Sequence, residues 1–255
     1  MTEDGIRYAA TDGVAWITLD RAEKRNAITL AMRERLATAF ADADADETVR
    51  VIVLGAQGPA FCAGTDLAEG AAATTVPLAM GKALTAPLDT VQKPVIAAVN
   101  GPAAGGGFEL ALACDIRIAS ENATFALPEV TIGSLPGSGG TQRLFRATSA
   151  AFAMQLLFTG APVDATTALR WGIVSEVVPA GELHAVAERL AHLIAKNAPL
   201  SLRAMKIATR AAMNAPLDVG LGIERMLWST LATTEDRAEG RAAFREQRPP
   251  RFTGR

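Results

Sequence analysis

Short apolar runs that end at turn residues restrict the fold of this chain more than any other feature. Three of them lie at residues 14–19, 51–54 and 93–99, and a further β-like run covers residues 114–119. Runs of this length with little polar alternation are typical of strands that are buried on both faces of a sheet. Helical patterns lie between several of these runs, and alternation of strands with helices favours parallel strands. We therefore expect an α/β protein with a largely parallel sheet.

Helix signals support this alternation. Thr29 can cap a helix in which the side chains of Met32, Leu36 and Phe40 fall on one face at i, i+4 and i+8. A shorter apolar helix is predicted over residues 108–113, immediately before the last of the four runs. Each predicted helix therefore connects two predicted strands.

The second half of the chain is predicted to be mostly helical. Asp164 can cap a short helix that Gly172 can close, and one last β-like run covers residues 173–178. Later helices are expected around residues 182–196, 200–213, 217–231 and 235–247, before an irregular tail. We therefore divide the chain into a core, residues 1–195, and a C-terminal helical region, residues 196–255.

The composition argues against several classes of protein. The 255 residues are 49% hydrophobic and carry a formal net charge of −2, so a nucleic-acid-binding surface over the whole chain is not expected. No stretch approaches the roughly 20 apolar residues of a membrane helix, and the first residues lack the apolar core of a signal peptide. The two cysteines, Cys62 and Cys114, lie far apart and outside any CxxC pair. We expect a cytoplasmic protein without membrane or nucleic-acid partners.

The two histidines do not indicate a metal or hydrolase site. His184 and His192 are eight residues apart, which does not match the i, i+4 pair of a helical metal site. The GxSxG sequence of a nucleophile elbow does not occur, since the nearest run, Gly137 to Gly140, lacks its spacing. No metal is therefore expected.

Three consecutive glycines precede the predicted helix over residues 108–113. Gly105, Gly106 and Gly107 suit a backbone that turns sharply and approaches another group closely. Exposed N–H groups at a helix N-terminus carry partial positive charge and suit an anion or a developing oxyanion. Glu109 lies in the first turn of this helix among apolar neighbours. From the residues alone, it is either a surface acid stabilised by the helix dipole or a functional acid in a pocket.

A second glutamate, Glu129, also has apolar neighbours on both sides. The segment from Gly137 to Gly140 follows it and again offers free N–H groups at the start of a helix. A solvated glutamate in a loop and a functional acid both fit this pattern. A dinucleotide fingerprint does not fit, because Gln142 stands where GxGxxG requires its third glycine.

Five motifs, in order along nearly the whole chain, together resemble the enoyl-CoA hydratase/isomerase (crotonase) superfamily. They are residues 20–27 (DRAEKRNA), 59–67 (PAFCAGTDL), 93–110 (KPVIAAVNGPAAGGGFEL), 127–144 (LPEVTIGSLPGSGGTQRL) and 234–244 (TEDRAEGRAAF). Each motif alone is a weak signal, whereas the ordered set is specific.

The resemblance implies a fold and an assembly. The fold is a crotonase-like (ClpP/crotonase) spiral of ββα units with a C-terminal helical trimerisation region. The assembly is a homotrimer, or a hexamer made of two trimers. Apolar side chains of the C-terminal helices are then expected to be partly buried between subunits, including Leu221, Ile223, Met226, Leu227 and Trp228.

The resemblance also implies an acyl-CoA thioester as substrate and no separate cofactor, since coenzyme A is part of the substrate. Members of the superfamily stabilise a thioester enolate with two backbone N–H groups, and the matching positions here are Thr65 and Gly106. Two such donors directed at the thioester oxygen would form an oxyanion hole. Because the donors belong to the backbone, a threonine at position 65 is no obstacle.

Members of this superfamily differ in the acidic residues of their sites. Hydratases share two glutamates, and the chain has a glutamate at both positions. The resemblance assigns Glu109 to the attacking water and Glu129 mainly to the proton on the α-carbon, with the N–H of Gly137 helping to hold the water. Two carboxyls can divide the proton transfers of hydration, although they titrate as a pair. We expect an enoyl-CoA hydratase of fatty acid β-oxidation. The alternatives are a Δ3-Δ2-enoyl-CoA isomerase, another crotonase-type acyl-CoA lyase, and a non-catalytic acyl-CoA binder.

Five further residues match positions that contact coenzyme A. Lys24 and Arg25 match the region near its nucleotide end. Ala63, Asp66 and Leu67 flank the contacts with the thioester and the adenine.

The C-terminus departs from the pattern of some hydratases. These have a lysine three residues after the position of Phe244, where it reaches the coenzyme A of a neighbouring subunit; here that residue is Gln247. Arg245, Arg248 or Arg251 would have to replace this contact.

The acyl end of the pocket differs as well. Leu127 replaces a polar residue of some hydratases, which alters the polarity of the pocket. Residues 68–84 are expected to line the acyl group, and the Ala-rich stretch over residues 69–77 to form a mobile loop. Their small side chains do not define the length of the acyl chain.

Overall fold

The computed structural model of the chain describes residues 5–66, 68 and 83–255. Its centre is a six-stranded sheet in the order β1-β2-β3-β4-β6-β9. These strands are β1 (Ile6–Thr11), β2 (Val14–Leu19), β3 (Val51–Ala56), β4 (Val95–Val99), β6 (Ile116–Ser120) and β9 (Glu176–Val178). The β1–β2 pair is antiparallel and every other pair in this sheet is parallel. The predicted largely parallel sheet is confirmed.

Helices cover both faces of this sheet, which explains why its strands lack polar alternation. In β3, Ile52 and Leu54 join the larger core cluster, which includes the buried face of α1 (Leu30–Ala45). Val51 and Val53 on the opposite face join a second cluster with α8 (Leu183–Ala195). Strands buried on both faces are characteristic of parallel sheets between helix layers.

The predicted helix cap at Thr29 is confirmed. Its side chain accepts a hydrogen bond from the N–H of Met32, and Met32, Leu36 and Phe40 are all buried. This cap sets the start of α1, so the apolar face of the helix meets β1 and β2.

Four of the predicted strands have wrong boundaries, among them the strand expected over residues 114–119, which is β6 and covers Ile116–Ser120. The strand expected over residues 173–178 begins only at Glu176, and the run over residues 51–54 continues to Ala56. Strand β4 begins at Val95 rather than at Lys93. The N–H of Val95 bonds to the carboxylate of Asp115, so a side chain takes the place of a sheet partner there. Side-chain hydrogen bonds of this kind leave no trace in hydrophobic periodicity.

The glycine-rich motifs lie around a second, smaller sheet with the order β5-β7-β8. It contains β5 (Ala103–Ala104), β7 (Thr124–Ala126) and β8 (Val163–Asp164). Helices α4 (Gly106–Ala113) and α7 (Ala165–Arg170) contact its strands. Helix α5 (Gly140–Ala147) packs on α4, α6 (Ala150–Thr159) packs on α5 and on the 3₁₀ helix η3 (Pro128–Ile132), and α3 (Ala86–Thr90) packs on α1. Two further 3₁₀ turns are η1 (Ala22–Lys24) and η4 (Ala180–Glu182).

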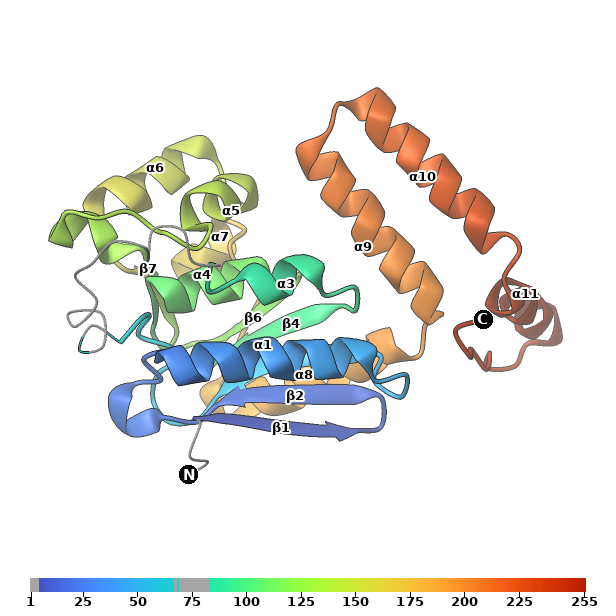
Figure 1. Cartoon of the computed structure of the whole chain (residues 1–255), viewed down its shortest axis with the longest axis horizontal. Helices are drawn as coiled ribbons and strands as arrows, with labels where there is room; N and C mark the ends of the chain where they lie inside the picture. Colours follow the sequence, from blue (N-terminus) through green and yellow to red (C-terminus); the bar gives the residue numbers. More distant parts are fainter. Residues whose placement is uncertain (1–4, 67, 69–82) are drawn as a thin grey trace.

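Three helices extend away from the sheet after residue 198: α9 (Pro199–Asn214), α10 (Leu217–Leu231) and α11 (Glu235–Glu246) (Figure 1). Helix α9 is attached to the core by Lys206, whose Nζ donates to the Asp115 carboxylate at 2.6 Å and to the carbonyl of Lys93 at 2.7 Å. Helix α8 ends at Ala195, close to the proposed boundary at 195/196. That the C-terminal helices form a separate unit stays a prediction.

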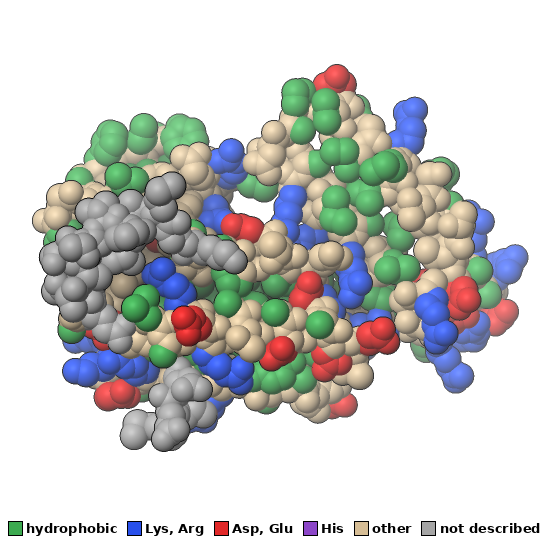
Figure 2. All heavy atoms as spheres, in the orientation of Figure 1, with side chains coloured by type: hydrophobic (Ala, Val, Ile, Leu, Met, Phe, Trp, Pro, Cys, Tyr) green, Lys and Arg blue, Asp and Glu red, His purple; other side chains and the backbone are tan. Residues whose placement is uncertain are grey.

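Helix α10 has no buried residue, although much of its sequence is apolar. Its exposed side chains include Leu217, Leu221, Met226 and Trp228. Figure 2 shows apolar side chains gathered over the arm formed by α9 and α10. A helix whose large apolar side chains are all left unburied is typical of a surface that another protein covers.

Among the residues the structure describes, no helix combines the length and the apolar character needed to cross a membrane.

Candidate active site

The three glycines form the sharp entry into α4. Gly105 has a φ of 53°, a backbone conformation that side chains disfavour, and it precedes the first helical residue, Gly106. A Cβ at Gly107 would lie 2.2 Å from the carbonyl oxygen of Cys62, so only glycine fits this close approach. The predicted turn and close approach are confirmed. As a result, the segment around Cys62 lies directly against the N-terminus of α4.

Two unused backbone N–H groups lie close together at the start of α4. Among the described residues, the backbone N–H of neither Thr65 nor Gly106 has a hydrogen-bond partner. A Cβ at Gly106 would lie 3.7 Å from the nitrogen of Thr65. The Thr65 segment is held in an extended conformation, because Ile28 donates to the carbonyl of Gly64 and accepts from the N–H of Asp66. Two rigid donors therefore lie side by side at the start of a helix, where an oxyanion is favoured.

Glu109 is a buried acid and not a surface one, with a side chain that is 3% exposed. Its Oε1 atom accepts hydrogen bonds from the N–H groups of Ser138 at 2.6 Å and Gly140 at 2.8 Å. The expectation that the N–H groups of the segment from Gly137 to Gly140 are free is therefore wrong for Ser138 and Gly140. The sequence pattern cannot show this, because the donors lie about 30 residues away from the acid.

The second acid, Glu129, lies in η3 and is half-buried. Its Oε2 atom is shielded from solvent and has no hydrogen-bond partner among the described residues. A Cβ at Gly105 would lie 3.0 Å from its Oε1 atom, so the carboxyl lies against the glycine turn. Burial, together with the nearby charge of Glu109, raises the pKa of Glu129 above its ordinary value. A carboxyl of this kind can hold a proton for delivery.

The structure thus brings the two glutamates, the glycine turn and both free N–H groups together, although their motifs are separate in sequence. Gly137 belongs to the same group: it is exposed, and its N–H has no partner in the described part of the chain. Leu127 is fully buried and packs in the main core cluster. It therefore contributes apolar surface behind η3 and no hydrogen bond.

The residues that match coenzyme A contacts lie at the edge of this group. Lys24 and Arg25 are exposed, and the carbonyl of Arg25 accepts a hydrogen bond from the N–H of Ala63. The side chain of Ala63, two residues before Thr65, is exposed. Leu67 lies outside the described residues, as does most of the stretch expected to line the acyl group, including all of the predicted mobile loop.

Arg21 is a residue of this region that the sequence did not single out. Its Nη1 atom donates to the Asp66 carboxylate at 2.6 Å and to the carbonyl of Ala27. The hydrogen bond from Arg21 lowers the pKa of Asp66, as does that from the N–H of Ala68. Asp66 is therefore an ionised anchor for the segment that carries the N–H of Thr65.

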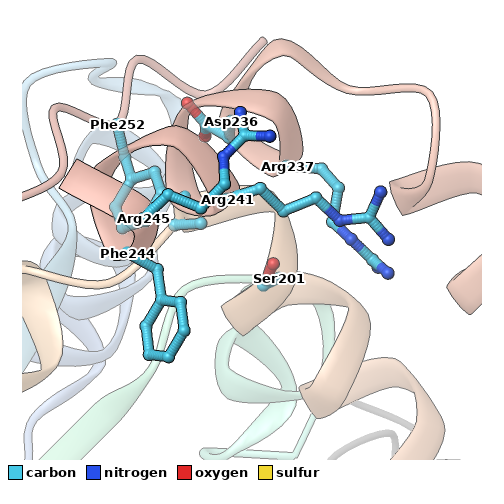
Figure 3. A pocket seen from close by; sticks show the side chains of 9 residues that line it. Ser201, Asp236, Arg237, Arg241, Phe244, Arg245 and Phe252 are labelled. Carbon is cyan, nitrogen blue, oxygen red and sulfur yellow. The ribbon is translucent and has the colours of Figure 1, made fainter. Parts of the chain in front are cut away.

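The C-terminal arginines differ in whether their guanidinium groups are free to bind a ligand. Arg248 is held by Glu239 and Glu246, each at 2.7 Å, so its guanidinium is already paired within the chain. The side chains of Arg245 and Arg251 have no hydrogen-bond partner among the described residues, and the neighbouring Phe244 is 86% exposed. A cavity of about 600 Å³ lies between α9 and α11, and Figure 3 shows Arg237, Arg241 and Arg245 around it.

No group of three or more His, Cys, Asp or Glu side chains that could hold a metal ion occurs within the described ranges. The acids, the backbone donors and the unused side chains described above are thus what the site offers to a ligand.

The chain is similar along nearly its whole length to proteins of known name. The profile of the family described as enoyl-CoA hydratase/isomerase matches residues 9–255. An (E)-benzylidenesuccinyl-CoA hydratase from Thauera aromatica is 44% identical over 98% of this chain and 99% of its own. A 2,3-dehydroadipyl-CoA hydratase from Escherichia coli K12 is 42% identical over 95% of this chain and 96% of its own. A crystal structure of an enoyl-CoA hydratase from Bacillus anthracis, 36% identical, superposes with a TM-score of 0.93 over 98% of this chain and all of that one.

Proposed function

Since the chain belongs to the enoyl-CoA hydratase/isomerase family, we propose that it is an enoyl-CoA hydratase that adds water across the 2,3 double bond of a 2-enoyl-CoA to give a 3-hydroxyacyl-CoA. The observation that carries the proposal is the arrangement of two glutamates in unlike environments beside two unused backbone N–H groups. Hydration needs a base for water, an acid for the α-carbon and a site for the negative charge that develops on the thioester oxygen.

Each of these requirements has a candidate in this chain. Glu109 takes a proton from water as the water oxygen bonds to the β-carbon, and the electron pair of the double bond moves toward the thioester oxygen. The N–H groups of Thr65 and Gly106 stabilise the resulting enolate, and the N–H of Gly137 helps to hold the water. Glu129 then delivers its proton to the α-carbon. The proton that Glu109 has gained returns to Glu129 through the pair or through solvent, which restores the starting state.

The different environments of the two acids support this division. Glu109 accepts two short backbone hydrogen bonds at Oε1, which hold the carboxyl in one orientation and leave Oε2 to accept the proton of water. Glu129 has a buried oxygen without a partner, and its raised pKa favours the protonated form that can act as an acid. Two carboxyls in one site can perform opposite roles when their surroundings differ, as the surroundings of Glu109 and Glu129 do.

Coenzyme A recognition is proposed to use Lys24, Arg25, Ala63, Asp66 and Leu67, of which Leu67 lies outside the described residues. The exposed side chains of Lys24 and Arg25 are available to phosphates, whereas Asp66 acts through its pairing with Arg21. For the contact that a lysine makes in some hydratases, Arg245 is a better candidate than Arg248, because the guanidinium of Arg248 is already paired.

Assembly into a homotrimer, or a hexamer of two trimers, belongs to the same proposal. The apolar side chains of α10 are unburied in the single chain, and burying them against a second copy would remove that surface from water. No other element in the described part of the chain combines this length with a complete lack of buried residues.

The hydratase proposal is tested by the absorbance of the conjugated thioester. A 2-enoyl-CoA should lose this absorbance with the purified protein, because hydration removes the conjugated double bond. A 3-enoyl-CoA that gains the absorbance, with no loss from the 2-enoyl-CoA, would indicate an isomerase instead. Tight binding of both without any change in absorbance would indicate a binder. Since the two relatives above are named for different acyl groups, a panel of acyl chains should accompany the assay.

A further inference from the structure

Two adjacent glycines in the segment from Gly137 to Gly140 each leave room for one charged side chain. Gly139 has a φ of 96°, and a Cβ there would lie 2.0 Å from the Nη1 atom of Arg143. A Cβ at Gly140 would lie 3.1 Å from the Oε1 atom of Glu109. The same turn is therefore in close contact with the guanidinium of Arg143 and with the carboxylate of Glu109.

Arg143 in α5 bonds to Ser138, the residue whose N–H donates to Glu109. Its Nη1 atom donates to the carbonyl of Ser138 at 2.8 Å and to the Thr85 hydroxyl at 3.0 Å, and its Nη2 atom is paired with Asp89. The Thr85 hydroxyl also donates to the carbonyl of Ser138, at 2.7 Å. Two donors thus fix the carbonyl of Ser138, whose N–H donates to Glu109.

We propose that Arg143, oriented by Asp89, is a positioning residue that sets the carboxylate of Glu109 for reaction. It does so through the Gly137–Gly140 turn and touches neither the substrate nor Glu109. Because Oε1 of Glu109 is occupied by the N–H groups of Ser138 and Gly140, Oε2 is the oxygen that remains to take the proton of water. The expected effect on kcat rests on the proposed hydration, whereas the effect on the position of Glu109 does not.

The charge and geometry of the contact explain why an arginine occupies this position. A guanidinium presents donors in a fixed plane, so one side chain can bond to a carbonyl, a hydroxyl and a carboxylate together. A lysine has a single nitrogen and cannot span the same three partners. Arg146, in the next turn of α5, is exposed, and its only described partner is the carbonyl of Gln142 in its own helix. It therefore provides a matched control.

The kinetic test compares Arg143→Met with Arg146→Met. Arg143→Met should lower kcat by about tenfold or more while KM changes by less than about threefold, the pattern of a lost transition-state interaction. Arg143→Lys should recover only part of the loss, and Arg146→Met should behave as the parent. Asp89→Asn should also lower kcat, because it removes the partner that orients Arg143. Since Asp89 is exposed, this variant is expected to fold even if Arg143→Met does not. Parental kcat in both Arg143→Met and Asp89→Asn would overturn the inference.

A double-mutant cycle separates positioning from a general structural role. If Arg143 acts through Glu109, adding Arg143→Met to Glu109→Gln should change the remaining kcat by less than about twofold, because coupled sites are not additive. If the two losses multiply, Arg143 acts independently of Glu109 and the inference is wrong.

Hydrogen-exchange mass spectrometry of peptides that cover residues 136–141 provides a readout without turnover. Arg143→Met should speed exchange of the Ser138 and Gly140 amides, whereas Arg146→Met should not. Unchanged protection would contradict the inference even in an active enzyme. A parent protein without hydratase activity would instead contradict the proposed function and leave this exchange result to decide the role of Arg143.

Discussion

The Oε1 atom of Glu109 lies 2.6 Å from the backbone nitrogen of Ser138, although 29 residues separate the two along the chain. This hydrogen bond fixes one oxygen of a buried carboxylate on the rigid turn before α5. A carboxylate held by backbone donors has little freedom to reorient, which suits a base that must meet a water molecule in one geometry.

Replacement of the base should affect chemistry and leave binding intact. Glu109→Gln should lower kcat for hydration by about a hundredfold or more, the scale expected for a positioned acid or base. An amide oxygen can still accept the hydrogen bonds from Ser138 and Gly140, so the turn should keep its structure. The measurement is the loss of conjugated-thioester absorbance under saturating substrate, with coenzyme A affinity measured by calorimetry. A kcat near that of the parent would show that Glu109 is not the base.

Glu129 should make the stability of the protein depend on pH in a definite direction. Its pKa in the folded state is raised above the ordinary value of 4.5, so the folded protein holds this proton more tightly than the unfolded chain. The free energy of unfolding therefore falls as pH rises from 4.5 through the raised pKa. Glu129→Gln, which removes the titration, should be more stable than the parent near neutral pH, and the difference should shrink below pH 4.5.

Thermal melting across this pH range checks the prediction. Glu129→Gln should also lower kcat by about a hundredfold. The same substitution is thus expected to raise stability and to reduce activity. A variant that melts at a lower temperature than the parent at neutral pH would mean that the ionised carboxylate has a favourable partner in the folded protein.

The oxyanion hole is tested by changes at Gly106. Gly106→Pro removes the N–H donor at the first position of a helix, where proline is tolerated, and should lower kcat by about a hundredfold to a thousandfold. Gly106→Ala keeps the donor but places a methyl group 3.1 Å from a Leu84 side-chain carbon. It should therefore retain much more activity than the proline variant.

Circular dichroism and melting temperatures show whether both Gly106 variants fold. Equal kcat values for the two folded variants would mean that the N–H of Gly106 does not stabilise charge in the reaction.

The apolar face of α10 should mediate assembly. Light scattering of the parent protein at micromolar concentration is expected to report a trimer or a hexamer. Leu221→Glu, at a position that is 52% exposed in the single chain, should shift the protein toward monomers, since a charge cannot be buried between apolar surfaces without a large cost. Leu193→Glu, at a similarly exposed leucine of α8, is the matched control and should leave the assembly unchanged. A monomeric parent would contradict the proposed assembly.

Much of the core follows from the sequence because its signals are local. Apolar runs predict β2, β3 and β4, and the Thr29 cap with its i, i+4 spacing predicts α1. The four C-terminal helices from α8 to α11 begin and end within one residue of their expected bounds, which is inside the usual uncertainty of helix ends. Their strong periodicity and their Pro and Asn boundaries explain this success.

The candidate site was only partly predictable, because its contacts join distant segments. The acids and glycines stand out by residue type, but nothing local reveals that Ser138 and Gly140 donate to Glu109. The pairing of Arg21 with Asp66 crosses 45 residues and was missed for the same reason. The short strand β9 also depends on long-range pairing with β6, which decides where its apolar run becomes a strand.

The most direct measurement uses a short straight-chain 2-enoyl-CoA in water enriched in a heavy oxygen isotope, with mass spectrometry of the product. We expect a product heavier than the substrate by one molecule of the labelled water, with the heavy oxygen in the 3-hydroxyl group. We further expect that this product becomes undetectable on the same timescale when Glu109→Gln and Glu129→Gln are combined. Recovery of only unchanged or isomeric enoyl-CoA from the parent protein, without incorporated oxygen, would contradict the proposed hydration.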